Sequence, residues 1–308
     1  MTVQDEMLLT DDLFEKLDDS EKNSEFIALE SKTFIKDAWD RFKKNRLALA
    51  GLTFMILLII GAIFVPMLSK YGYETQNLDN TYAKPCLAHL LGTDNLGRDN
   101  LVRIMWGARF TLSIAFAAAF INLVIGVVYG GVAGFVGGKL DMILMRIVDV
   151  IYSVPSLLYT ILILLVFGGN VASMLLAISV TSWMQMARQV RTQIMSLKEM
   201  EFAMAARVIG ASNKRILLKH LIINALGPII VCLTMMIPSA IFTESSLSYL
   251  GIGIPAPTPT WGRLISECQQ MVHIDPIQVV WPILFMSVTI LSLNFIGDGI
   301  GEALEPKR

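Results

Sequence analysis

The chain has 308 residues, of which 54% are hydrophobic and 17% charged, and its formal net charge is −1. Its mean hydropathy of +0.60 is far above that of a soluble domain. Apolar runs longer than about 18 residues recur along it, which is typical of membrane-spanning segments. These figures exclude an ordinary soluble protein. The net charge says little about partners, because it sums an acidic N-terminal segment and basic loops.

The N-terminal region changes character at about residue 30. Residues 1–30 carry ten acidic residues against two lysines, whereas a cleavable signal peptide begins with basic residues and an apolar core. We therefore expect no signal peptide and interpret this segment as an acidic cytoplasmic tail. Residues 31–47 are basic, with aromatic and apolar residues at helical spacing, which predicts an amphipathic helix along the cytoplasmic membrane surface.

The remainder, residues 48–308, predicts an all-α, polytopic membrane protein with six transmembrane helices. The expected spans cover about 48–68, 111–136, 142–167 (interrupted by Pro155), 171–187, 228–250 and 280–300. The loop 188–227 carries seven basic residues and the loop 251–279 only Arg263, and such an excess marks the cytoplasmic side. Both termini are therefore expected in the cytoplasm.

The second expected span has a glycine at every fourth position: Gly126, Gly130, Gly134 and Gly138. One face of this helix is nearly bare backbone, which allows close approach of a neighbouring helix. We interpret this pattern as tight packing.

The long inner loop contains a helical elbow, which we define as residues 199–220. A helix over 199–209 is expected to end at Gly210, because glycine readily adopts the backbone angles that end a helix. Ser212 or Asn213 can cap a second helix that runs through His220. Long loops with helices of their own are usually functional, so the elbow is a candidate docking element.

Two acids lie at membrane depth, Asp149 in the third expected span and Glu244 in the fifth. From the helix rise, Asp149 is roughly 10 Å from the inner end of its span and Glu244 roughly 10 Å from the outer end of its own, so they are not an obvious pair. They are either hydrogen-bonded contacts between helices, with Arg146 as a partner for Asp149, or they line a solute path or gate.

The first outer loop contains Gly92, Thr93, Asp94, Gly97, Arg98 and Asp99. It is either a docking or entrance element, or a glycine-rich turn held by Asp–Arg pairs. The basic residues Arg98, Arg103 and Arg109 do not fit an outer loop. We expect them at the membrane interface, held by Asp94 and Asp99.

Nothing in the sequence indicates an enzyme. The cysteines (Cys86, Cys232, Cys268) and histidines (His89, His220, His273) are scattered, so we expect neither a disulfide framework nor a metal site, and we expect the histidines at the surface. The only Gly-Lys pair, Gly138-Lys139, is followed by Leu140 and lacks the other residues of a phosphate-binding loop. Any ATP must be bound by another chain.

Several motifs follow one another along the chain, at 91–99, 205–212, 242–253, 261–262 and 294–306. In this order they resemble the C-type permease, the second membrane subunit of oligopeptide and dipeptide ABC importers. The resemblance implies the type I ABC importer permease fold and an ATPase-coupling role for Met204, Ala205, Ala206, Arg207, Gly210, Ala211 and Ser212. Two residues depart from the family pattern: Met204 replaces a usual glutamate, and Ile223 a common proline.

The resemblance also implies the partners. These are a B-type permease subunit in a heterodimer, two cytoplasmic ATP-binding subunits that hold ATP and Mg²⁺, an extracytoplasmic peptide-binding protein and the peptide itself, in the lipid bilayer of the bacterial cytoplasmic membrane and with no nucleic acid. The elbow would act as a lever that rocks spans three to five.

Alternatives remain open at this point. The substrate could be a dipeptide or a nickel chelate, although the basic N-terminal helix and the C-terminal sequence most resemble the oligopeptide branch. A proton-coupled carrier that uses Asp149 and Glu244 would need no ATPase. A purely structural scaffold would tolerate changes in the elbow.

Overall fold

The computed structural model describes residues 33–269, 272–273 and 275–305. The chain divides into two compact units, residues 1–37 and 38–308. Helix α1, Phe34–Phe42, lies within the expected amphipathic range and crosses this division. The expected acidic tail, 1–30, lies outside the described residues. All that follows concerns the second unit.

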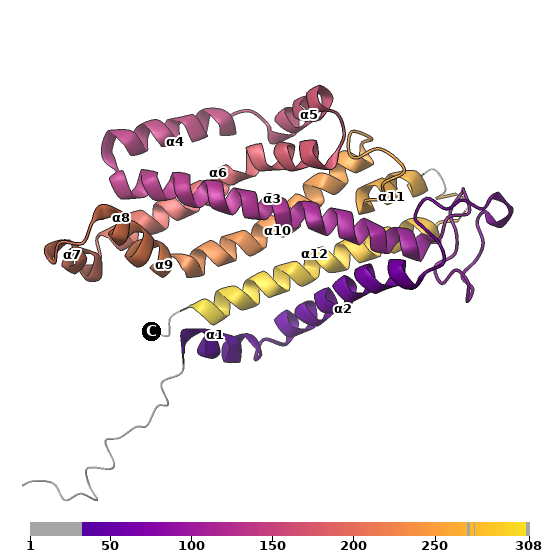
Figure 1. Cartoon of the computed structure of the whole chain (residues 1–308), viewed down its shortest axis with the longest axis horizontal. Coiled ribbons are helices and arrows are strands. Elements are labelled where there is room, and N and C mark those ends of the chain that lie inside the picture. The colour runs from indigo at the N-terminus through magenta and orange to yellow at the C-terminus, as the bar shows by residue number, and fades with distance from the viewer. Residues whose placement is uncertain (1–32, 270–271, 274, 306–308) are drawn as a thin grey trace, which may run out of the picture. The chain divides into compact units, whose positions relative to one another are not determined.

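The second unit is built from long helices, drawn in Figure 1. Four described helices are long and apolar enough to cross a membrane: α2 (Arg46–Leu68), α3 (Asn100–Val136), α10 (Leu226–Tyr249) and α12 (Ile277–Leu304). The third expected span is a pair, α4 (Gly138–Tyr152) and α5 (Ser156–Phe167), bent by 76°. Pro155 immediately precedes α5, as expected for a residue that cannot continue a helix. Counted as one span, the pair raises the number to five.

The fourth expected span, 171–187, forms part of α6, Val171–Lys198. By length and composition the described residues give four or five spans rather than six, because α6 does not qualify. The reason lies in its second half, where Gln185, Arg188 and Gln189 lower its hydropathy. A helix with polar residues at membrane depth faces protein or water rather than lipid.

Helix α3 begins at Asn100, well before the expected start at 111. Asp99 caps it, since its carboxylate accepts a hydrogen bond from the Val102 backbone N–H at 2.9 Å. The charged stretch before the expected span thus contains the first turns of the helix, and Arg103 within it is buried and paired inside the protein.

Helices α3 and α6 pack closely, as the glycine spacing predicted. A Cβ built on Gly126 would lie 2.5 Å from the Met186 Cβ, and one on Gly134 would lie 2.8 Å from the Arg191 carbonyl oxygen. Gly130 faces the Ala187 backbone between them. Gly138 does not take part, because it begins α4 and has open space around it.

Three shorter elements follow α6, namely α7 (Glu201–Val208), α8 (Asn213–Arg215) and α9 (Ile222–Asn224), with a π-helix, η4, over Ile216–Leu221 between the last two. Helix α11, Trp261–Gln269, lies between α10 and α12. A buried apolar cluster joins Met186, Val190 and Ile194 of α6 to Ala203 and Ala206 of α7. Through this cluster α7 is packed against the membrane helices.

Candidate functional site

The elbow turns at Gly210, as the sequence predicted. Gly210 has φ of +79°, and the Ala211 backbone N–H donates to the Ala206 carbonyl oxygen at 3.0 Å, which closes the end of α7. The Ser212 hydroxyl caps the next turn and accepts from the Arg215 N–H at 3.4 Å. The second helix through His220 is less regular than expected, because most of it is the π-helix η4.

Most of the predicted coupling residues are displayed on the elbow surface. Those exposed are Met204, Ala205, Arg207, Gly210 and Ser212, whereas Ala206 is buried and Ala211 is half-buried. Figure 1 shows α7 and α8 at the end of the unit opposite α11.

Two apolar residues that the sequence reasoning did not select are strongly exposed on the elbow. Val208 is 87% and Ile209 is 84% exposed. Exposed apolar residues that adjoin each other indicate a surface that another protein covers. The only sequence signal for them is a Val-Ile pair immediately before the helix-ending glycine.

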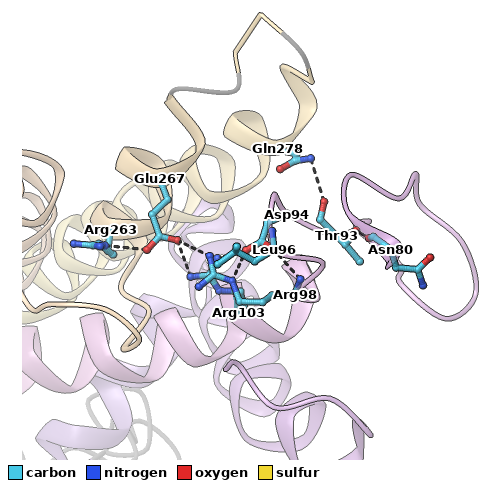
Figure 2. Close-up of polar contacts among 9 residues, drawn as sticks. All are labelled: Asn80, Thr93, Asp94, Leu96, Arg98, Arg103, Arg263, Glu267 and Gln278. Atoms are coloured by element: carbon cyan, nitrogen blue, oxygen red, sulfur yellow. Dashed lines mark hydrogen bonds and ion pairs between the residues drawn. The ribbon is translucent and has the colours of Figure 1, made fainter. Parts of the chain in front are cut away.

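At the opposite end, the outer loop is held by a buried ion-pair cluster (Figure 2). The Asp94 carboxylate accepts from Arg98 Nε and from Arg103 Nη1, each at 2.6 Å. Glu267 of α11 accepts from Arg103 at 2.8 Å, from Arg98 at 3.1 Å and from Arg263 at 2.9 Å. Arg103 is only 2% exposed, so its pair with Asp94 is shielded from solvent, whereas the side chains of Glu267 and Arg263 are partly exposed.

The charges in this cluster alter the acidity of Glu267. Burial by itself would raise its pKa, but the positive charge and hydrogen bond of Arg103, the hydrogen bond from Arg263 and the charge of Arg98 together outweigh it. The pKa of Glu267 therefore lies below its ordinary value. The sequence reasoning missed Glu267, which lies 164 positions from Arg103 and has no local motif that marks it.

The remaining outer-loop residues differ from expectation. Asp99 pairs with His89 at 2.8 Å, and both side chains are buried, so His89 is not the surface residue that was expected. Arg109 is not held by Asp94 or Asp99. It donates to the backbone carbonyl oxygens of Ala62 and Ile63 instead, and it stacks on Trp106. The burial of Asp94, Arg98 and Asp99 favours the turn held by ion pairs over direct contact with a docking partner.

The two acids at membrane depth do not meet. Asp149 pairs with Arg188 of α6 at 2.9 Å rather than with Arg146, and both side chains are partly exposed. Glu244 is fully buried and accepts hydrogen bonds from the hydroxyls of Ser248 at 2.7 Å and Thr111 at 3.1 Å. Glu244 thus joins α10 to α3, as a contact between helices.

A second ion pair connects α4 and α6 and was not foreseen. Arg191 forms a two-pronged contact with Asp141, and its Nη2 lies 2.6 Å from Oδ2. Within the described residues no group of three or more histidine, cysteine or acidic side chains could hold a metal ion.

These features define a multi-pass helical membrane protein with an exposed helical elbow at one end and a rigidly held loop at the other. The chain belongs to the family of binding-protein-dependent transport system inner membrane components, whose model matches residues 126–308. A second model, the N-terminal TM domain of oligopeptide transport permease C, matches residues 33–85. It is therefore a transport permease component rather than an enzyme. It is a multi-pass protein of the cytoplasmic membrane that works with an ATPase and a binding protein.

Two curated relatives from Bacillus subtilis (strain 168) are similar over nearly their whole length. The oligopeptide transport system permease protein OppC is 42% identical over 295 residues, which is 96% of this chain and 97% of the relative. The dipeptide transport system permease protein DppC is 41% identical, covering 93% of this chain and 91% of the relative. A chain from an inward-facing structure of the MetNI methionine ABC transporter matches with a TM-score of 0.55 at 19% identity, covering 67% of this chain and 97% of that one. This structural match shows a shared fold.

Proposed function

We propose that this chain is the C-type permease subunit of an ATP-driven oligopeptide importer. It forms half of a translocation path with a related B-type subunit, and an extracytoplasmic protein delivers the peptide. Two cytoplasmic subunits bind ATP and Mg²⁺, and one of them holds the elbow of this chain. Both termini lie in the cytoplasm. The match to the oligopeptide permease C model over residues 33–85 supports the oligopeptide branch, and the relative named for dipeptides keeps dipeptides as the alternative.

The observation that carries the coupling role is the construction of the elbow. Its outer side presents Val208 and Ile209 to a partner, and its inner side buries Ala203 and Ala206 against α6. A partner that pulls on the exposed side therefore moves a packed unit rather than a loose loop. Such a change needs an ATPase that binds the two membrane states with different affinity.

Each predicted coupling residue then has a distinct part. Met204, Ala205 and Arg207 contact the ATPase, and Met204 does so without the ion pair that a glutamate would form. Ala206 has room only for a small side chain, since it is buried in the cluster with α6. Gly210, Ala211 and Ser212 set the turn angle. Asp149 lies beside the path through its pair with Arg188, and Asp94, Arg98 and Asp99 hold the outer entrance in shape.

The test of transport is uptake by proteoliposomes that contain the complete complex with its delivery protein. A labelled pentapeptide, a dipeptide and nickel are compared with and without ATP. We expect ATP-dependent entry of the pentapeptide. Uptake of only the dipeptide or nickel would contradict the substrate, and uptake without ATP would contradict the mechanism and favour a proton-coupled carrier.

The test of coupling is Gly210→Val. A β-branched residue at a φ of +79° is strained, by about 1–3 kcal/mol, so the turn between α7 and α8 will change. We expect a complex that still assembles, at full or reduced yield, but loses peptide uptake and the ATPase activity that loaded delivery protein stimulates. Gly168→Val is a matched control, because Gly168 also has a φ of +79° with open space around it but lies outside the elbow. Normal uptake by Gly210→Val would exclude the lever.

A further inference from the structure

A polar groove of about 690 Å³ lies among α4, α5, α6 and α10. Helix α6 supplies one wall with polar residues, each of which is three or four positions from another of the set, so that they share one broad face: Thr181, Ser182, Gln185, Arg188, Gln189 and Thr192. A helix face of this kind is unstable against hydrocarbon, so it borders water or another protein.

The groove carries no strong net charge. Arg188 is its one cation, and Asp149 neutralises it at 2.9 Å while the Tyr152 ring lies 4.6 Å from the guanidinium. Several hydroxyls are turned toward their own helices. Thr243 donates to the Ser239 carbonyl oxygen at 2.8 Å. A hydroxyl used in this way offers only acceptor lone pairs to the groove.

A second hollow, of about 460 Å³, continues from the first toward the opposite end of α10. The first reaches Leu250, just beyond the C-terminal end of α10, and the second reaches Gly227 at its N-terminal end. Gln185 and Gln189 line both hollows and therefore stand where the two meet. Among the described residues, neither amide side chain has a hydrogen-bond partner, although each offers two donors and one acceptor.

We propose that Gln185 and Gln189 bind the backbone of the peptide as it passes from one hollow to the other. This inference rests on the proposed peptide transport. The two glutamines are separated by a rise of about 6 Å along α6. Alternate residues of an extended peptide repeat at about 6.7 Å, so each amide can meet a backbone N–H and C=O on the same edge of the peptide. Because the proposed hydrogen bonds involve only the peptide backbone and the groove has no strong net charge, it can accept peptides with different side chains.

The experiment replaces each amide by leucine, alone and together, in the complete reconstituted complex. Leucine has a similar size and no hydrogen-bonding group. Each variant removes an amide that makes up to two hydrogen bonds to the peptide, and loss of one lowers an equilibrium constant by about two- to tenfold. We therefore expect uptake of a labelled pentapeptide, and ATPase stimulation by loaded delivery protein, to fall by at least about threefold in each single variant and at least about tenfold in the double variant. Assembly of the complex remains at wild-type level.

Gln193→Leu is the matched control. Gln193 is the same residue type, one turn beyond Gln189 on α6, and it lines neither hollow. In parallel, a pentapeptide with a photoreactive side chain is cross-linked during turnover, and the attached residues are mapped by mass spectrometry. We expect adducts on α6 near 185–189.

The outcomes separate this inference from the function on which it rests. If the wild-type complex shows no ATP-dependent pentapeptide uptake, the proposed substrate fails. If the wild type transports but Gln185→Leu and Gln189→Leu match Gln193→Leu, the backbone contact is wrong. If those two variants lose complex assembly while Gln193→Leu does not, this face of α6 packs against the partner permease. The inference that it binds the peptide is then overturned.

Discussion

The packing of α3 on α6 makes a sharp prediction at two neighbouring glycines. A Cβ on Gly130 would fall against the Ala187 backbone, 2.9 Å from its carbonyl carbon and 3.0 Å from its Cα. A Cβ on Gly131 would meet only the Leu217 Cδ1, at 3.9 Å. The two sites share a helix and burial class and differ in what faces them.

The expected energies follow from this difference. Alanine favours a helix over glycine by about 1 kcal/mol, so Gly131→Ala gains up to that amount. Gly130→Ala gains the same stability from helix propensity, but overpacking the contact with α6 costs about 1–3 kcal/mol. The cost is at the upper end of this range here, because backbone rather than a flexible side chain must shift. We expect a net loss of about 2 kcal/mol for Gly130→Ala. The two variants then differ by about 3 kcal/mol.

Thermal unfolding of the purified protein in detergent measures the effect. One kcal/mol corresponds to about 2 °C for a protein of this size, so Gly130→Ala lowers the midpoint by about 4 °C and Gly131→Ala raises it slightly. Equal midpoints for the two variants, or a lower midpoint for Gly131→Ala, would refute the assignment of the Gly130 face to α6.

Two further predictions concern α11. Glu267→Gln leaves the charge of the buried Arg103 poorly compensated and lowers stability by about 3 kcal/mol at pH 7. Because the pKa of folded Glu267 lies below its ordinary value of 4.5, this contribution is complete above that value and is lost as the pH falls through the folded pKa, so the midpoints of wild type and variant should converge in acid. A gap that is constant with pH would contradict the ion-pair origin. Burial raises the pKa of the Cys268 thiol to about 11, so only about one molecule in 10⁴ is a thiolate at pH 7. We expect maleimide to modify the exposed Cys86 and spare Cys268 in the native protein, as mapped by mass spectrometry, and comparable labelling of both would show that α11 opens.

The features that could be predicted from sequence are those with a local signal. The helix ends near Leu68 and Val136, the close face of Gly126, Gly130 and Gly134, and the turn at Gly210 all follow from the order of neighbouring residues. The break at Pro155 was also foreseen, but the 76° bend was not, because a proline ends a helix without fixing the direction of the next.

The features that escaped prediction are pairings over long separations. Arg103 pairs with Glu267, Arg191 with Asp141, and Asp149 with Arg188. The two residues of each pair lie far apart in the sequence and come together only in the folded chain. From hydropathy, Arg98 and Arg103 were expected to lie at the membrane interface. Once paired with Asp94 they can be buried, so α3 begins earlier than an apolar window allows. Sequence patterns therefore locate the helices better than the charges that hold them together.

Helix α6 connects these observations. Through Met186 and Ala187 it packs on the glycine face of α3, and through Ile194 it shares a buried cluster with α7 of the elbow. Its remaining face carries Gln185 and Gln189 into the two hollows. In the proposed mechanism, a force on Val208 and Ile209 passes from α7 through this buried cluster to α6, and then along α6 to the glutamines. Because α3 is locked to α6, it must move with it. Disturbing the Gly130 contact should therefore weaken coupling as well as stability, whereas Gly131→Ala should leave coupling intact and raise stability slightly.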